Sequence, residues 1–178
     1  MKRWISLALA GAMALSLLSG CSGREAGGST FTVALDSDIV ALDPAFAYDF
    51  TTNPVINQIT EELLTFDENN ELVPWLASSW SQTDDTTYVY TIRDDVCFSD
   101  GTPMTMDDVI FSIERTMNPD TGSYLEWMFA PVESIEQTGD WELTVKLSQP
   151  SATWQYVFGT TAGHVISKTY YEEHADNF

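Results

Sequence analysis

The sequence has 178 residues, of which 27 are acidic and only 7 are basic, so its formal net charge is −20 at pH 7. A nucleic-acid-binding chain needs a positive surface, and this composition provides none. Direct adhesion to anionic lipid is excluded for the same reason. An acidic surface most often serves solubility, and a preference for a cationic substrate is the alternative.

The first 30 residues have the features of an export signal. Lys2 and Arg3 precede an apolar run of 14 residues over 5–18, shorter than the ~20 residues that a membrane-spanning helix needs. The run ends in Leu18-Ser19-Gly20-Cys21, which resembles a bacterial lipobox. We therefore expect a lipoprotein signal peptide over 1–20, lipidation of Cys21 and a flexible tether over 21–30. The alternative is a plain signal peptide that is cut near the same place.

These expectations place the protein on the membrane, lipid-anchored on its extracytoplasmic side, in the periplasm or on the outer face of the cytoplasmic membrane. Loss of Lys2 and Arg3 with the signal leaves 5 basic and 27 acidic residues, a formal charge of −22. With Cys21 lipidated, Cys97 is the only thiol left, so no internal disulfide is expected. Cys97 lies in a strand-like run and is expected to be a small buried hydrophobe.

The sequence after residue 30 has patterns that predict alternating strands and helices. Residues 31–35 are rich in strand formers, and residues 36–48 form a loop. Asn53 and Pro54 are a favoured N-cap and first position for a helix. Its apolar stripe is Val55, Ile56, Ile59 and Leu63. Residues 64–66 and 72–73 flank a turn and predict a hairpin.

The middle of the chain is the most regular. Apolar residues alternate over 88–93, and an Asp-Asp turn should pair this strand with 79–82. Asp100-Gly101 predicts a second turn. Thr105 and Asp108 have the spacing of a helix N-cap with a carboxylate in the first turn. The expected stripe of this helix is Val109, Ile110, Ile113 and Met117.

The last part of the chain predicts one more strand pair and one more helix. Residues 141–147 alternate cleanly and are expected to pair with a strand around Ile135, through a turn at Gly139-Asp140. A short helix is expected to begin at Ser167 and to run through His174.

This order of elements carries motifs that resemble those of the family 5 extracellular solute-binding proteins of ABC transporters, the peptide, dipeptide and nickel class. The matching residues are Pro74, Leu76, Ala77 and Trp80; Arg93 with Asp94 or Asp95; Phe98, Gly101 and Pro103; Asp107, Asp108 and Val109; and the Leu42-Asp43-Pro44-Ala45 signature. Cys97 departs from the polar or basic residue that is more common there. The resemblance covers nearly all of 31–178.

The resemblance implies an α/β fold of the periplasmic-binding-protein type, type II and two-lobed. Members are much longer, and a Gly-Thr-Gly-Pro-Tyr-like segment that tends to follow is absent. Residues 31–178 are therefore expected to be a truncated, N-terminal part of the first lobe with its β-rich subdomain. Because the family closes two lobes over its ligand, such a part would present half of a binding site.

The resemblance also implies the function. The protein is expected to be the substrate-binding component of an ABC importer, which captures oligopeptides or dipeptides and delivers them to permease and ATPase subunits. The implied ligand-side residues are Asp36, Ser37, Asp38, Tyr124 and Trp127. Their ordinary alternatives are a solvated loop for the first three and local core for the two aromatics. Alternative ligands are nickel, a metal chelate or an oligosaccharide, and an alternative role is a peptide-sensing surface lipoprotein.

Catalysis has little support in the sequence. No nucleophile motif, phosphate loop or helical pair of metal-binding histidines occurs. Asp67, Asn69 and Glu71 imitate the start of an EF-hand loop, but Leu72 and Ser78 stand at its sixth and twelfth positions. We expect no enzyme, no cofactor and no metal site.

Overall fold

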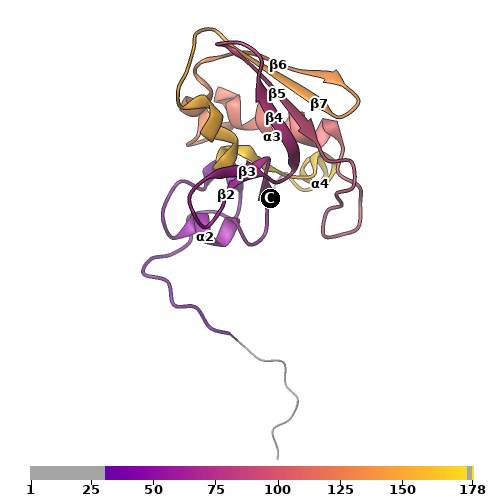
Figure 1. Ribbon diagram of the computed structural model, residues 1–178. Coiled ribbons are helices and arrows are strands. Elements are labelled where there is room, and N and C mark those ends of the chain that lie inside the picture. The colour runs from indigo at the N-terminus through magenta and orange to yellow at the C-terminus, as the bar shows by residue number, and fades with distance from the viewer. Residues whose placement is uncertain (1–30, 176–177) are drawn as a thin grey trace, which may run out of the picture. The chain divides into compact units, whose positions relative to one another are not determined.

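A four-stranded antiparallel sheet forms the centre of the fold, as the computed structural model shows (Figure 1). The structure describes residues 31–175 and 178. Contacts divide the chain after Ala34, and the elements below belong to Leu35–Phe178. The strand order in the sheet is β4-β5-β7-β6. The bounds are β4 Ala77–Gln82, β5 Thr87–Ile92, β6 Val132–Gly139 and β7 Glu142–Leu147.

The two faces of this sheet differ because side chains alternate along each strand. On β5 and β7, one face carries buried Tyr88, Tyr90, Ile92, Leu143, Val145 and Leu147. Tyr90 lies opposite Leu143 and Tyr88 opposite Val145, so the apolar residues of the two strands share one side. The other face carries Thr91, Thr144 and Lys146 and meets solvent. This one-sided burial is typical of an antiparallel sheet with a single core.

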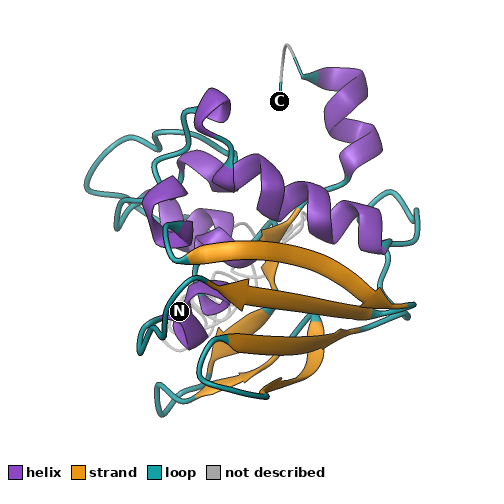
Figure 2. Ribbon diagram, turned by 90° about the horizontal axis from the view of Figure 1, so that it is seen from above, coloured by secondary structure: helices purple, strands orange, loops and turns teal. Residues whose placement is uncertain are grey.

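Helix α3, Met106–Met117, lies across the sheet (Figure 2). Val109 and Ile113 on this helix are buried, and they join the same core as the apolar sheet face. Trp154 and Phe158 complete it, with ring centroids 5.3 Å apart in an edge-to-face arrangement. The core therefore lies between the sheet, α3 and the segment around residue 154.

Shorter elements surround this core. Two small antiparallel sheets pair β1 Glu61–Glu62 with β8 His164–Val165, and β2 Leu64–Phe66 with β3 Leu72–Pro74. The remaining helices are α2 Thr52–Ile56, α4 Lys168–His174 and the 3₁₀ turns η2 Pro44–Phe46, η3 Pro119–Thr121, η4 Glu126–Phe129, η5 Trp154–Gly159 and η6 Thr161–Gly163. Among the residues 31–175 and 178, no helix has the length and apolar character that crossing a membrane requires.

Most of the predicted elements are confirmed. Both hairpins form, and Gly101 has a φ of 89° in the predicted turn. Thr105 caps α3 in a full capping box with Asp108, and the stripe over 109–117 is buried or half-buried. Ile135 pairs with Val145. Ser167 is the N-cap of α4 and accepts from the amide of Tyr170.

The strand expected over 31–35 is wrong. These residues have no regular structure, and Phe31 is 89% exposed. A strand needs hydrogen bonds from a neighbouring strand, and no described strand pairs with this segment. Strand-forming composition alone does not replace a partner.

The first predicted helix is partly wrong. Helix α2 begins at Thr52, before Pro54, and its N-cap residue Thr51 makes no side-chain capping bond. The carboxylate of Asp49 instead accepts from the amides of Thr51 and Thr52 at 3.0 and 2.9 Å. The helix ends at Ile56, so Ile59 and Leu63 lie outside it. The chain leaves the helix because β1 pairs with β8, which lies far away in the sequence.

The expected burial of Cys97 is also wrong, because its side chain is exposed. Cys97 forms an isolated bridge with Pro103, between half-buried Val96 and Phe98. Alternation along this short extended segment turns the thiol outward when its two neighbours turn in. The signal peptide, Cys21 and the tether over 21–30 lie outside the described residues.

Candidate functional site

The loop that contains Asp36, Ser37 and Asp38 is fastened to the start of α2. Asp36 Oδ1 accepts a hydrogen bond from Thr51 Oγ1 at 3.0 Å, and Ser37 Oγ lies 2.7 Å from the same hydroxyl. The amide of Val40 donates to Thr52 Oγ1 at 3.0 Å. Thr51 and Thr52 are buried, whereas the three predicted site residues are exposed. The loop is therefore held through the side chains of Asp36 and Ser37, and all three residues remain exposed.

Asp49 holds Thr51 and Thr52, the two residues to which the loop is bonded. Hydrogen bonds from the Thr52 side chain and from the Thr52 and Thr51 amides stabilise its charged form, and they hold the pKa of Asp49 below its ordinary value. The carboxylate thus stays ionised at neutral pH and fixes the threonines that hold the loop.

A cluster of aromatic rings joins the segment after Asp43 to the segment around Tyr124. The ring of Tyr124 meets Tyr48 at a centroid distance of 4.7 Å and Phe46 at 5.7 Å, both edge to face. Phe46, Tyr48 and Tyr124 are called the aromatic cluster below. Tyr124 remains 52% exposed, so its ring is available to a ligand as well as to its neighbours.

Trp127 has surroundings different from those of Tyr124, although the two residues are close in sequence. It belongs to η4 and is 72% exposed. It lines a cavity of about 540 Å³ together with Pro131, Pro150 and Tyr156. Tyr124 does not line this cavity. Tyr124 and Trp127, which the sequence places in one segment, thus have different neighbours.

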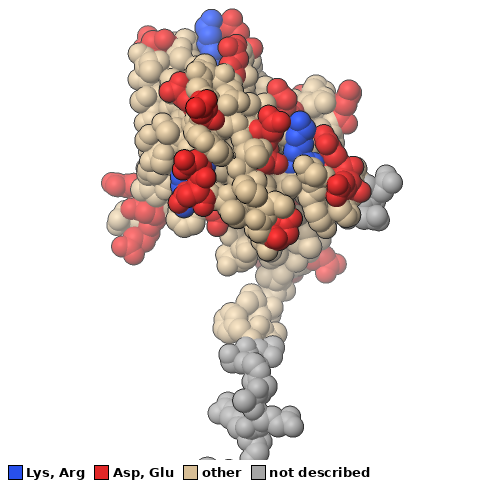
Figure 3. Space-filling view, turned by 90° about the vertical axis from the view of Figure 1, so that its right-hand side faces the viewer, with Lys and Arg blue, Asp and Glu red and all other residues tan. Residues whose placement is uncertain are grey.

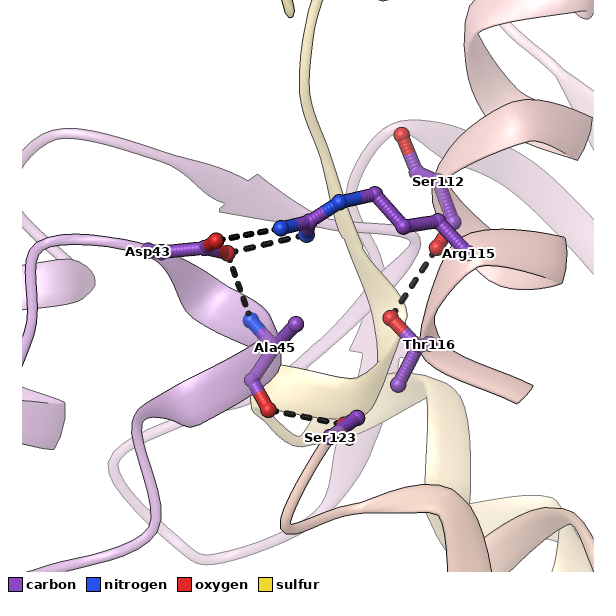
Figure 4. A network of polar contacts seen from close by, with 6 residues as sticks. All are labelled: Asp43, Ala45, Ser112, Arg115, Thr116 and Ser123. Carbon is purple, nitrogen blue, oxygen red and sulfur yellow. Dashed lines mark hydrogen bonds and ion pairs between the residues drawn. The ribbon is translucent and has the colours of Figure 1, made fainter. Parts of the chain in front are cut away.

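An ion pair between Asp43 and Arg115 was not foreseen in the sequence. Asp43 precedes η2, and Arg115 belongs to the last turn of α3. The guanidinium donates two hydrogen bonds to the two carboxylate oxygens, one of them 3.0 Å long between Nη1 and Oδ1 (Figure 4). The only signal in the sequence was the Leu-Asp-Pro signature, which marks Asp43 without indicating a partner.

Other polar groups have structural roles. Asp67 Oδ1 accepts from the amides of Asn69 and Glu71, both at 2.8 Å, and so closes a turn. His164 is buried between Thr60, 2.6 Å from Nδ1, and Glu62, 3.3 Å from Nε2. Within the described part of the chain, no group of three or more His, Cys, Asp or Glu residues could hold a metal ion.

Acidic residues outnumber basic ones in this chain by 27 to 7. Figure 3 shows Asp and Glu scattered over one face, with few Lys and Arg among them. Such scattering suits solubility. The loop exposes carboxylates and a hydroxyl, and the aromatic cluster exposes the rings of Tyr48 and Tyr124.

Comparison with known proteins gives the family. The sequence profile of the bacterial extracellular solute-binding proteins, family 5 (middle), matches residues 71–178. The chain belongs to this family. Its mixed α/β architecture is that of the type II periplasmic binding proteins.

Three relatives illustrate the likeness. The periplasmic murein peptide-binding protein MppA of Escherichia coli K12 is 36% identical over 90 residues, 51% of this chain and 17% of that protein. A dipeptide-binding protein of Lactococcus lactis subsp. cremoris is 25% identical over 175 residues, 88% of this chain and 32% of that protein. The structure of NikZ from Campylobacter jejuni with Ni(L-His) has a TM-score of 0.67 and 30% identity, over 78% of this chain and 27% of NikZ. The chain thus spans a third or less of the length of these relatives.

Proposed function

We propose that this chain is part of an extracytoplasmic receptor that captures oligopeptides or dipeptides and delivers them to the permease and ATPase subunits of an ABC importer. The observation that carries the proposal is the family match over 71–178, together with relatives named for peptide binding. The receptor captures its ligand and converts nothing. Its location is the membrane surface, with the lipid of Cys21 as the anchor.

The proposed ligand side consists of the loop over Asp36, Ser37 and Asp38 and of the aromatic residues Tyr124 and Trp127. Extended peptides are often held by main-chain hydrogen bonds, with pockets for alternate side chains. The exposed carboxylates of the loop suit the amide and ammonium groups of a peptide. The open ring of Tyr124 suits an apolar side chain. Trp127 would extend this surface toward its own cavity.

Replacement of Tyr124 by Ala tests the ligand side. We expect Tyr124→Ala to weaken binding of tri-alanine by about fourfold, because burial of one alanine methyl group against the ring contributes about 0.8 kcal/mol. Isothermal titration calorimetry on the protein that carries this chain measures the change. The matched control is Tyr170→Ala, since Tyr170 is 51% exposed but stacks on His174. Equal affinities in both variants would contradict the assignment of Tyr124.

The lipid anchor has its own test. We expect wild-type cells to incorporate radiolabelled palmitate into the protein and Cys21→Ser to abolish the label and the membrane fractionation. Cys97→Ser is the control, because it removes the other thiol of the chain and should change neither. Labelling that persists in Cys21→Ser would contradict Cys21 as the lipidated residue, and a wild type without label would favour the plain signal peptide.

A second candidate ligand is a metal chelate. It is favoured by one observation, the 30% identity to NikZ, whose structure holds Ni(L-His). The same scaffold hosts different ligands, so nickel, its chelates and oligosaccharides stay the rivals to peptides. Peptide sensing is the rival role, and genes for two permeases and two ATPases beside this one would favour transport.

A further inference from the structure

The Asp43–Arg115 ion pair is unusually buried for a surface receptor. Each of the two side chains keeps only 9% of its exposure, whereas the Arg93–Asp95 pair on the surface keeps 43% and 67%. Taking two charges out of water is costly, and their attraction often does no more than offset that cost. Such a pair is therefore weak evidence for stability, and its position in the chain indicates another role.

The pair is connected to the aromatic cluster through one residue, Ala45. Asp43 Oδ1 accepts from the Ala45 amide at 3.0 Å. The Ala45 carbonyl in turn accepts from Ser123 Oγ at 2.7 Å (Figure 4). It also accepts from the Tyr124 amide at 3.2 Å. Both polar groups of the Ala45 backbone are thus occupied, one toward the ion pair and one toward the Tyr124 segment.

These bonds fix the rings on both sides of the cluster. Phe46 follows Ala45 directly in the η2 turn, and Tyr48 comes two residues later. Tyr124 is tied by its own amide to Ala45. A rotation of the η2 turn would therefore move Phe46 and Tyr48 relative to Tyr124. The centroid distances of 5.7 and 4.7 Å depend on the orientation of this turn.

Arg115 is itself held firmly. Its guanidinium carbon lies 4.4 Å from the centre of the Tyr171 ring of α4, in cation–π geometry. On the same helix, Ser112 Oγ accepts from the Ile166 amide at 3.0 Å, which ties α3 to the chain that leads into α4. Arg115 therefore provides Asp43 with a fixed partner that belongs to the core, and not to the loop.

We propose that Asp43 and Arg115 are positioning residues for ligand binding: their buried ion pair orients the η2 turn so that the aromatic cluster presents Tyr124 and Tyr48 as one preformed surface. This proposal rests on the proposed function only in that the ligand contacts these rings. Preformed geometry favours binding because less conformational freedom is lost when the ligand arrives. Neither residue touches the ligand.

The test compares two variants of the pair with a matched lesion at the surface. Asp43→Asn keeps an oxygen for the Ala45 amide but removes the charge, and Arg115→Met removes both hydrogen bonds. Arg93→Met breaks the exposed pair, which is also bidentate but uses Nε and Nη2 of Arg93, at 2.8 and 3.2 Å from Asp95. Each protein is labelled with 3-fluorotyrosine, and Tyr48→Phe and Tyr124→Phe assign the two ¹⁹F resonances.

We expect Asp43→Asn and Arg115→Met to shift the Tyr48 and Tyr124 resonances, because the edge-to-face ring contact is lost. The resonances of buried Tyr88 and Tyr90, assigned through Tyr88→Phe and Tyr90→Phe, should stay unchanged. Calorimetry with tri-alanine should show binding about tenfold weaker. Arg93→Met should change neither quantity. Should Arg115→Met fail to fold, Asp43→Asn alone decides the question.

Two results separate the possibilities. A fall in Tm without movement of the two resonances would show that the pair only stabilises the fold, and the positioning role would be overturned. Movement of the resonances in a protein whose wild type does not bind tri-alanine would support the positioning of the rings and overturn peptide binding as the function.

Discussion

Asp108 illustrates how one carboxylate can serve two elements. Its Oδ2 accepts from the Thr105 amide at 2.8 Å and completes the capping box of α3, while its Oδ1 accepts from the Lys168 amide at 2.8 Å, at the start of α4. The side chain of Thr105 accepts from the Asp108 amide in return. The residue is buried, so both bonds are shielded from water.

Substitutions in the capping box of α3 should lower the free energy of unfolding by different amounts. Thr105→Ala should lower the free energy of unfolding by about 1 kcal/mol through loss of the cap. Asp108→Ala should cost about 2–4 kcal/mol, because it also leaves the Lys168 amide without its partner. Urea unfolding measures both. Asp107→Ala is the control, since Asp107 is exposed in the same turn. A cost for Asp108→Ala no larger than that of Asp107→Ala would contradict this account.

Some contacts between single residues could be predicted from the sequence, and others could not. The Thr105–Asp108 pair was predicted because a capping box is local and its spacing is fixed. The Asp43–Arg115 pair joins residues 72 positions apart, and no local pattern connects them. Cys97 was predicted to be buried, and this was wrong. The direction of its side chain is set by its half-buried neighbours Val96 and Phe98 and not by the chemistry of the thiol.

At the scale of elements, the pairing of β1 with β8 explains the largest departures from prediction. Glu62 lies opposite His164 in this small sheet. The periodicity of residues 55–63 suits a helix, yet the chain forms a strand at 61–62 because its partner lies about a hundred residues further along. Local propensity is a weak prior when such a tertiary partner is present. Strands with partners close in sequence, such as β4 and β5, were predicted correctly.

The same strand pair should make stability depend on pH. Burial lowers the pKa of His164 from 6.5 to about 4. Glu62 opposes this shift, but burial of the ring dominates, and Nδ1 is already hydrogen-bonded to a hydroxyl. Because the unfolded chain binds the proton more readily, stability should fall as the pH drops from about 6.5 toward 4, by up to about 1.4 kcal/mol per unit.

Urea unfolding at pH 7 and pH 5 tests this dependence, in a range above the titration of most carboxylates. We expect the wild type to lose stability between the two values and His164→Asn to lose clearly less. A wild type that is equally stable at both values, or a variant with the same loss, would show that His164 does not remain neutral when buried.

At the scale of the whole molecule, the sequence predicted the class of fold better than the site. Ordered motifs over 71–117 carried the resemblance to the family, and their turns, cap and alternation could be predicted because these features are local and have fixed spacings. The candidate site depends on hydrogen bonds between distant parts of the chain, from Thr51 to Asp36 and from the Tyr124 amide to Ala45, which no local pattern predicts. The placement of Trp127 beside a separate cavity could not be read from its sequence neighbours.

The most direct test is a thermal-shift measurement on the protein that carries this chain, with tri-alanine, nickel plus L-histidine, and maltotriose as separate probes. A ligand that binds the native state stabilises it by about 2.7 kcal/mol at a hundredfold excess over its Kd. The account predicts that tri-alanine raises Tm and that the other two probes do not. A rise with nickel plus L-histidine or with maltotriose, and none with tri-alanine, would contradict it.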